Sequence, residues 1–263
     1  MSAVPQADEP IMLRADAAGV ATLTLNRPTQ FNSLSRALLA ELTAELQAIR
    51  ADASVRVVVI TGAGKAFCAG HDLKEMRSDS SPEFQRQLFS ECARLMTLIT
   101  QLPQPVIAKV QGVATAAGCQ LVAQCDLAVA AEHVKFAVSG INLGLFCSTP
   151  AVALARNIGR KAAFEMLSTG DFITAARARE LGLINRIAPA AELDAAVAQL
   201  TANLVSKPAI SLARGKEGFY RQIEMGLEGA YQYAAETMAC NMGDHAAQEG
   251  IDAFIDKRPP RWD

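Results

Sequence analysis

The chain has 263 residues, of which 51% are hydrophobic and 20% charged, and its formal net charge is −2 at pH 7. This length supports one large domain, or a domain with an appendage, around an extensive core. The charge balance gives no reason to expect nucleic-acid binding, and no apolar run reaches the roughly 20 residues that a transmembrane helix requires. We therefore expect a globular protein with neither nucleic-acid nor membrane partners.

The cysteines and the first residues bear on the compartment. Six cysteines are scattered through the chain, with no Cys-x-x-Cys pair and no regular spacing of a disulfide framework. The opening stretch "MSAVPQADEPIML" has neither a basic start nor an apolar run, so we expect neither a secretory signal nor a transit peptide. Both features favour reduced thiols and a cytoplasmic localisation.

In chain order, strand-like runs alternate with segments of helical periodicity. Strands are predicted at 20–26, 55–61, 105–111, 126–131 and 182–188. The segment 36–52 has the apolar spacing of an amphipathic helix. Asn32–Ser33, just before it, are its candidate N-cap. After Ala190, four helices are predicted at 190–206, 208–224, 226–242 and 244–258. The alternation predicts an α/β fold with buried sheets, followed by a helical layer of the kind that makes subunit contacts.

Several familiar motifs fail on inspection. The stretch "GAGKAFCAGHD" at Gly62–Asp72 suggests a nucleotide loop, but Val59 and Ala66 stand where a Walker A motif needs glycine and Ser or Thr. A dinucleotide fingerprint would need a third glycine at Phe67. Ala137 replaces the first glycine of a nucleophile elbow. These substitutions argue against a nucleotide-binding loop and a serine hydrolase.

A metal site is also disfavoured. Cys68 and His71 are close in sequence, but His133 and His245 have no ligand spacing, and a lone cysteine is usually a small core residue. We expect no bound metal.

What remains is a pair of helix starts after small-residue loops. The runs 55–61 and 105–111 each lead into such a loop and then into a helix that begins near His71–Asp72 or near Ala116–Ala117. The first N–H groups of a helix have no partner within it, so two starts that face one cavity would bind a developing oxyanion. Asp72 with Glu75 resembles a capping box, and Thr115 is a candidate cap for the second helix.

With these loops in place, the sequence resembles the crotonase (enoyl-CoA hydratase/isomerase) family. The matching segments are "LTLNRPTQFNSLS", "VVVITGAGKAFCAGHDLKEM", "PVIAKVQGVATAAGCQLVAQCDLAVAAE", "KFAVSGINLGLF" and "EGIDAFIDKRPPRW". The resemblance implies a crotonase-like β-β-α spiral over residues 1–195 and a helical region over 196–263 that builds trimers, commonly paired into hexamers. It also implies an acyl-CoA thioester as ligand, with coenzyme A as part of the substrate and no separate cofactor.

The resemblance further implies site residues. The thioester oxygen would accept from the backbone N–H groups of His71 and Ala117, with Gly118 adjacent. Asp126 matches a Cys-Asp element that looks structural rather than catalytic. The positions that match the family's CoA- and substrate-binding segments are Arg27, Lys65, Ala69, His71, Asp72, Leu73, Lys74, Phe254 and Lys257.

The sequence departs from the family at its acid–base positions. Hydratases of the family carry two glutamates, and the resemblance places Gln120 and Gly140 at those positions. Neither residue can titrate, whereas hydration needs groups that give and take a proton. Cys147 and Ser148 are candidate nucleophiles or water-positioning groups, but with no assigned base beside either, a small residue capping a helix is the favoured explanation.

Three functions stay open at this point. The first is an enoyl-CoA hydratase/isomerase-like enzyme that keeps the oxyanion hole without the two-glutamate mechanism. The second is hydrolysis of a CoA thioester, or isomerisation of its acyl chain, with an unassigned base. The third is a non-catalytic acyl-CoA-binding or assembly protein.

Overall fold

The computed structural model describes residues 10–262, so the first nine positions of the opening stretch lie outside it. A large sheet has the order β1-β2-β3-β5-β7-β10. Only β1 runs antiparallel to its neighbour, and the other pairings are parallel. Its strands are β1 (Met12–Ala17), β2 (Val20–Leu25), β3 (Val57–Gly62), β5 (Val106–Val110), β7 (Leu127–Ala131) and β10 (Arg186–Ala188).

A second, smaller sheet has the order β4-β6-β8-β9. It comprises β4 (Ala66–Cys68), β6 (Val113–Thr115), β8 (Lys135–Ala137) and β9 (Ile173–Thr174). The chain alternates between the two sheets. Strands β3, β5 and β7 of the large sheet are followed by β4, β6 and β8 of the small sheet, respectively. Helices follow each such pair of strands. This repeat confirms the crotonase-like β-β-α spiral.

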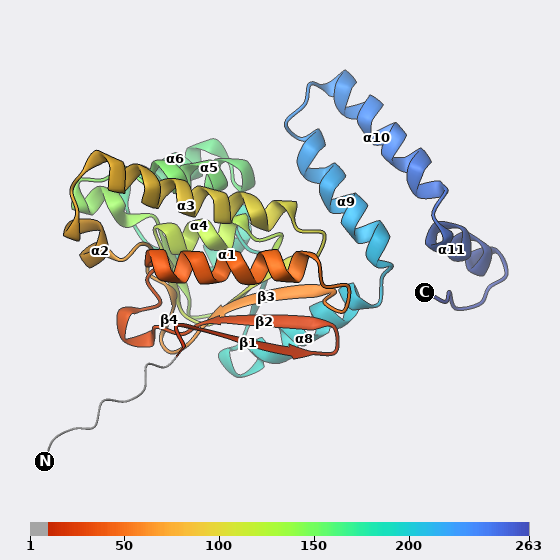
Figure 1. Ribbon diagram of the computed structural model, residues 1–263, viewed down its shortest axis with the longest axis horizontal. Helices are drawn as coiled ribbons and strands as arrows, with labels where there is room; N and C mark the ends of the chain where they lie inside the picture. Colours follow the sequence, from red (N-terminus) through yellow and green to blue (C-terminus); the bar gives the residue numbers. More distant parts are fainter. Residues whose placement is uncertain (1–9, 263) are drawn as a thin grey trace, which may run out of the picture.

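Helices cover the large sheet. α1 and α3 lie side by side along one face, and α8 packs against β3, β7 and β10 (Figure 1). The helices are α1 (Arg36–Arg50), α2 (Leu73–Ser78), α3 (Pro82–Gln101), α4 (Ala117–Gln124), α5 (Ser148–Asn157), α6 (Arg160–Thr169), α7 (Ala175–Leu181), α8 (Leu193–Val205), α9 (Ala209–Gln222), α10 (Leu227–Met242) and α11 (His245–Ile255). Short 3-10 turns, η1 to η3, occupy Pro28–Gln30, Ser139–Leu143 and Ala190–Glu192.

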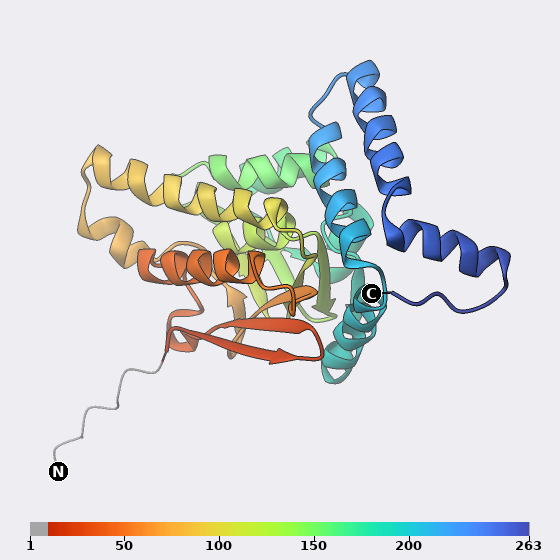
Figure 2. The same ribbon diagram turned by 45° about the vertical axis from the view of Figure 1, so that its right-hand side comes forward.

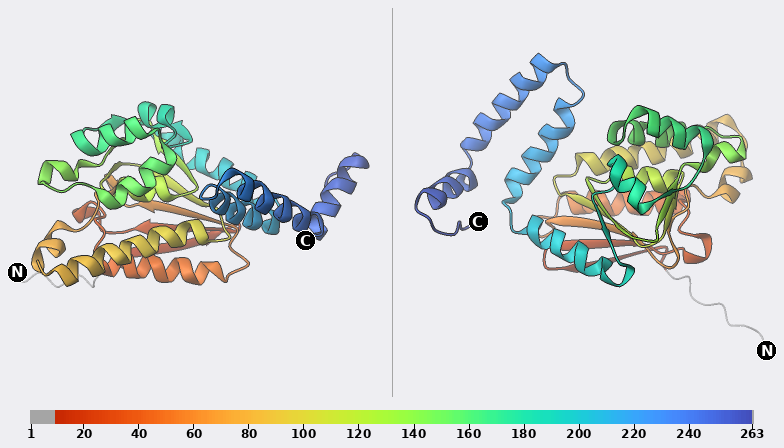
Figure 3. Two further views of the ribbon diagram at one scale, coloured as in Figure 1. Left: turned by 90° about the horizontal axis from the view of Figure 1, so that it is seen from above. Right: turned by 180° about the vertical axis from the view of Figure 1, so that it is seen from behind.

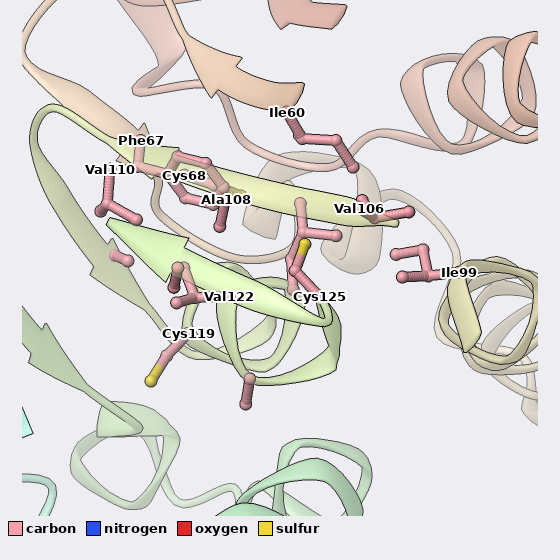
Figure 4. Close-up of a cluster of buried hydrophobic side chains, with 14 of the residues drawn as sticks. Ile60, Phe67, Cys68, Ile99, Val106, Ala108, Val110, Cys119, Val122 and Cys125 are labelled. Carbon is pink, nitrogen blue, oxygen red and sulfur yellow. The ribbon is translucent and has the colours of Figure 1, made fainter. Parts of the chain in front are cut away.

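The core sits between the large sheet and its helices. Every residue of β3 is buried, as expected for a parallel strand covered on both faces. Figure 4 shows part of this core around β5, with Ile60 of β3 on one side and Val122 of α4 on the other. Because α4 is itself buried along most of its length, its first turn has a fixed place relative to the sheets.

Of the last three helices, only α9 packs closely against the spiral, where it contacts α3. α9 runs past the end of α3, and α10 and α11 project beyond it (Figures 2 and 3). The four predicted C-terminal helices are all present, as α8 to α11. α8 spans the predicted boundary at 195/196, and the division into two regions stays a prediction. Within residues 10–262, no helix has the length and apolarity needed to cross a bilayer.

Some local predictions are wrong. The strand predicted at 182–188 begins only at Arg186, because Gly182 ends α7 in a left-handed conformation and a turn follows. Ser35 rather than Asn32–Ser33 caps α1, by accepting from the N–H of Leu38. The small-residue loops after β3 and β5 contain the short strands β4 and β6. Three-residue strands carry too little periodicity to be recognised in a sequence.

Candidate functional site

The two predicted helix starts lie next to each other. β4 and β6 pair in parallel with Cys68 opposite Ala114, so the loops that follow them, with His71 in one and Ala117 in the other, begin side by side. A Cβ built on Gly70 would lie 3.2 Å from the Ala117 nitrogen, which shows how closely the two loops approach. The small residues of both loops are therefore needed for this approach.

The backbone of His71 has an orientation that its neighbours define. Leu34 donates its N–H to the Gly70 carbonyl at 2.8 Å and accepts from the Asp72 N–H at 3.2 Å, forming a parallel bridge centred on His71. In an extended strand successive N–H groups point to opposite sides. The His71 N–H consequently points away from Leu34.

The start of α4 has an unusual backbone. Ala116 precedes the helix at φ 49° and ψ −120°, a region that favours glycine. No side chain caps α4, and the predicted cap Thr115 is wrong, because its hydroxyl donates to the Ala69 carbonyl at 3.0 Å. Ala117 is the first residue of the helix, where N–H groups have no intrahelical partner. A Cβ on Gly118 would lie 2.0 Å from the Cys68 carbonyl oxygen, so glycine is required there.

Asp72 caps α2 as predicted. Its carboxylate accepts from the N–H groups of Lys74 and Glu75, and it forms an ion pair with Arg27 at 2.9 Å. Burial raises the pKa of Asp72, but the hydrogen bond from Arg27 and those from the backbone outweigh it and leave the pKa below its ordinary value. The reciprocal half of the capping box is absent, because Glu75 accepts from the N–H of Arg36 instead. Arg27 therefore fixes the loop that carries His71.

His71 is partly exposed, but both nitrogens of its imidazole ring are buried. Neither ring nitrogen has a partner in residues 10–262, and the ring meets Phe89 of α3 edge-on at 5.4 Å. Burial lowers the pKa of His71, against a smaller opposing effect of the Leu34 backbone, so the ring is neutral at pH 7. Phe89 could not be identified from the sequence, because it looks like any apolar residue of an amphipathic helix.

Gln120 lies one turn into α4 from Ala117. Its side chain is 3% exposed, and Oε1 has no hydrogen-bond partner within the described part of the chain. It lines a cavity of about 1210 Å³ between α3, α4, α5 and α9. Neither His71 nor Ala117 lines that cavity.

Gly140 and Cys147 are in contact. A Cβ on Gly140 would lie 2.6 Å from the Cys147 Sγ and 2.8 Å from the Leu145 carbonyl oxygen. Burial raises the pKa of the Cys147 thiol, and the backbone of Gly140 only partly offsets it. Ser148 is exposed, and its hydroxyl donates to the Phe146 carbonyl. Cys147 stands at the N-cap of α5 without a capping hydrogen bond from its side chain.

Comparison with known proteins identifies the family. A model of the enoyl-CoA hydratase/isomerase family matches residues 15–263. The chain belongs to the enoyl-CoA hydratase/isomerase family. A crystal structure of an enoyl-CoA hydratase from Mycobacterium smegmatis is 56% identical, with a TM-score of 0.95 over 97% of this chain and 99% of that one. The human enoyl-CoA hydratase domain-containing protein 3 is 39% identical, with a TM-score of 0.93 over 96% and 100%.

The comparison also corrects the expected compartment. The mitochondrial enoyl-CoA hydratase domain-containing protein 3 of Xenopus laevis is 42% identical over 93% of this chain and 83% of that protein. The mouse and human relatives are likewise named mitochondrial. These names contradict the cytoplasmic localisation expected from the sequence. Scattered cysteines without a disulfide framework do not distinguish one reducing compartment from another, so they could not decide between the cytoplasm and the mitochondrion.

In this member of the family, the predicted substrate-binding residues fall into separate groups. Ala69, His71 and Asp72 lie together at the loop pair, while Lys65, Leu73 and Lys74 are exposed around it. Phe254 and Lys257 belong to α11 and the turn after it, at the opposite end of the molecule from α2 (Figure 1). A single chain therefore does not bring the two groups together. In the part of the chain that the structure describes, no three His, Cys, Asp or Glu residues are placed to hold a metal ion.

One buried ion pair anchors α9. Lys216 donates to Asp126 at 2.6 Å and to the carbonyls of Ile99 and Gln104, and Tyr220 also donates to Asp126, at 2.8 Å. The Asp126 Oδ2 that accepts from Lys216 also accepts from the backbone N–H of Val106. Asp126 is thus structural, as expected, and it holds α9 over the cavity. The role of Lys216 was not predicted from the sequence, because a single lysine in a helix normally lies on the surface.

Proposed function

We propose that the protein binds an acyl-CoA thioester and holds its carbonyl oxygen between the backbone N–H groups of His71 and Ala117. Coenzyme A enters as part of the substrate, and the proposal requires no further cofactor. The observation that carries the proposal is the close approach of the two loops: a Cβ on Gly70, next to His71, would lie 3.2 Å from the Ala117 nitrogen. The orientation of the His71 N–H away from Leu34 supports it further.

Such a pair of donors stabilises the negative charge that develops on a thioester oxygen when the acyl chain forms an enolate-like anion. Removing one donor of this kind typically costs about 10² to 10³ in rate. The positive end of the α4 dipole adds to the effect. Because the donors are backbone groups, the side chains of His71 and Ala117 are free to differ from those of relatives.

The acid–base part of the reaction differs from two-glutamate hydration. Gln120 has no proton to exchange, and Gly140 has no side chain. We infer that the protein is an enoyl-CoA hydratase/isomerase-like enzyme whose chemistry relies on the oxyanion donors, and that rapid hydration of an enoyl thioester is not its reaction. A nucleophilic role for Cys147 is disfavoured, because burial raises the pKa of its thiol and a thiolate is the reactive form. The alternative function is that of a non-catalytic acyl-CoA-binding protein, and the absence of both carboxylates favours it.

A two-part experiment separates these functions. Calorimetry with butyryl-CoA and crotonyl-CoA measures binding, and mass spectrometry resolves products from a panel of saturated, unsaturated and hydroxylated acyl-CoAs. Binding with a converted thioester supports the enzyme, and binding with no product supports the carrier. Absence of binding to every acyl-CoA would contradict both.

We also propose that the protein forms a homotrimer, or a hexamer of paired trimers, through its C-terminal helices. In support, α10 and α11 carry large apolar side chains that are strongly exposed in the single chain, including Leu227 at 76% and Phe254 at 85%. Such a surface is characteristic of a subunit interface. Light scattering after chromatography measures the mass, and a monomer at micromolar concentration would contradict the proposal.

A further inference from the structure

The Thr115 side chain links the two loops that carry the proposed oxyanion donors. Its hydroxyl donates to the Ala69 carbonyl at 3.0 Å. Ala69 stands two residues before His71, and Thr115 stands two residues before Ala117. Within residues 10–262, no other side chain forms a hydrogen bond between positions 69–72 and positions 115–118. The hydroxyl therefore joins the loops at the same distance along the chain from each donor.

The strands that precede the loops do not fix the alignment of the loops by themselves. The register of β4 against β6 shifts between Ala66 and Cys68, so that two steps along β4 match one step along β6. An irregularity of this kind bends the strand and changes the direction of the residues next to it. Because the loops begin directly after it, their alignment needs a contact of its own.

The backbone of each loop is bonded to a different part of the fold. The Ala69 N–H donates to the Phe31 carbonyl, ahead of α1, at 3.0 Å. The Ala116 N–H donates instead to the Ala137 carbonyl of β8, also at 3.0 Å. The Thr115 hydroxyl is thus a direct polar link between two segments whose backbone bonds lead to separate elements.

We propose that Thr115 is a positioning residue, whose hydroxyl sets the separation of the His71 and Ala117 N–H groups so that both reach one thioester oxygen. This inference rests on the proposed thioester-binding function. Both donors must lie about 2.7–3.1 Å from the oxygen, and a displacement of about 1 Å can cost about 10²-fold in rate. Valine has a similar size and is equally suited to a strand. The bond to the Ala69 carbonyl, rather than packing, therefore accounts for a hydroxyl at this position.

The test separates alignment of the donors from stability of the fold. The infrared band of bound butyryl-CoA, labelled with ¹³C at its carbonyl carbon, is measured in the full-length protein and in Thr115→Val and Thr115→Ser. We expect Thr115→Val to bind butyryl-CoA between about two- and tenfold more weakly, as loss of one ordinary hydrogen bond would give, and to show a smaller shift of the band to low frequency. Thr115→Ser keeps the hydroxyl and should retain the shift. A purely structural role would lower stability and leave the band of the folded variant unchanged.

Thr61→Val is the matched control, because the Thr61 hydroxyl donates to the Lys109 carbonyl at 2.9 Å and links β3 with β5 instead of the two loops. It should lower stability in urea and leave the carbonyl shift intact. If Thr115→Val does not fold, Thr115→Ala removes the same hydroxyl without added bulk. An unchanged shift in the variant that lacks the hydroxyl, or an equal reduction in Thr61→Val, would overturn the inference while thioester binding stands. Absence of a shift in the wild type would contradict the proposed function as well.

Discussion

The Cys147 sulfur packs directly against Gly140, because a Cβ built on Gly140 would be only 2.6 Å from it. Contacts shorter than 3 Å force something to move, and the Leu145 carbonyl at 2.8 Å blocks a second direction. The residues at 140 and 147 therefore depend on each other. Restoring a carboxylate at position 140 needs more than a single substitution.

We predict that Gly140→Ala lowers the free energy of unfolding by about 1–3 kcal/mol, the usual cost of overpacking. Cys147→Ala in the same chain should recover part of this loss, because it removes the sulfur. Gly229→Ala in α10 is the control, since nothing lies within 4 Å of its added Cβ. Urea unfolding measures all four proteins. Full stability of Gly140→Ala would show that the two residues are not coupled.

Ala116 is a second source of local strain. Its φ of 49° and ψ of −120° cost an L-residue about 1–3 kcal/mol. Ala116→Gly is expected to raise the free energy of unfolding by roughly 1 kcal/mol, because the relief of strain exceeds the added flexibility of the unfolded chain. Ala48→Gly, at an exposed position of α1, should instead lower it by roughly 0.5–1 kcal/mol. If both variants are destabilised equally, the strain at Ala116 is absent.

The neutral His71 ring predicts a pH dependence. Burial lowers its pKa in the folded protein below the ordinary value of 6.5, so the unfolded chain binds a proton more readily. Stability from this group is complete above pH 6.5 and is lost as pH falls through the folded pKa. Wild type should therefore lose stability relative to His71→Leu between about pH 7 and pH 5. Urea unfolding across that range measures the difference, and a constant difference would contradict the lowered pKa of the ring.

The Lys216–Asp126 pair predicts coupled substitutions. Lys216→Met leaves the Asp126 carboxylate buried beside Tyr220 without its cation, which typically costs about 3–5 kcal/mol. Adding Asp126→Asn removes the unpaired charge, so the double variant should be more stable than Lys216→Met alone. Thermal unfolding measures stability, and limited proteolysis within α9 reports its detachment. Additive losses would show that the pair does not anchor the helix.

Much of the spiral could be predicted from the sequence, because long buried strands and amphipathic helices leave clear periodic patterns. The helix start at Ala117 followed from a run of small residues between apolar segments. The strands β4 and β6 could not be predicted, although their pairing brings the loops of His71 and Ala117 side by side. Three residues are too few for a pattern, and their pairing depends on distant parts of the chain.

The environments of individual side chains could not be predicted from the sequence either. The sequence placed Gln120 beside the helix start, but not its burial or its unpaired oxygen. It could not show that Gly140 and Cys147 compete for the same space, nor that Lys216 reaches Asp126 from α9. Each of these contacts joins residues on separate elements of the folded chain, so no local sequence pattern predicts it.

The most direct test of the oxyanion donors is the infrared spectrum of bound butyryl-CoA labelled with ¹³C at its carbonyl carbon. Two backbone N–H groups on the oxygen weaken the carbonyl bond, so its stretching band should move to lower frequency than in free butyryl-CoA. Ala117→Pro removes one donor at a helix position that tolerates proline, and it should reduce the shift in a folded variant. A carbonyl band that is unchanged on binding to the wild-type protein would contradict the account.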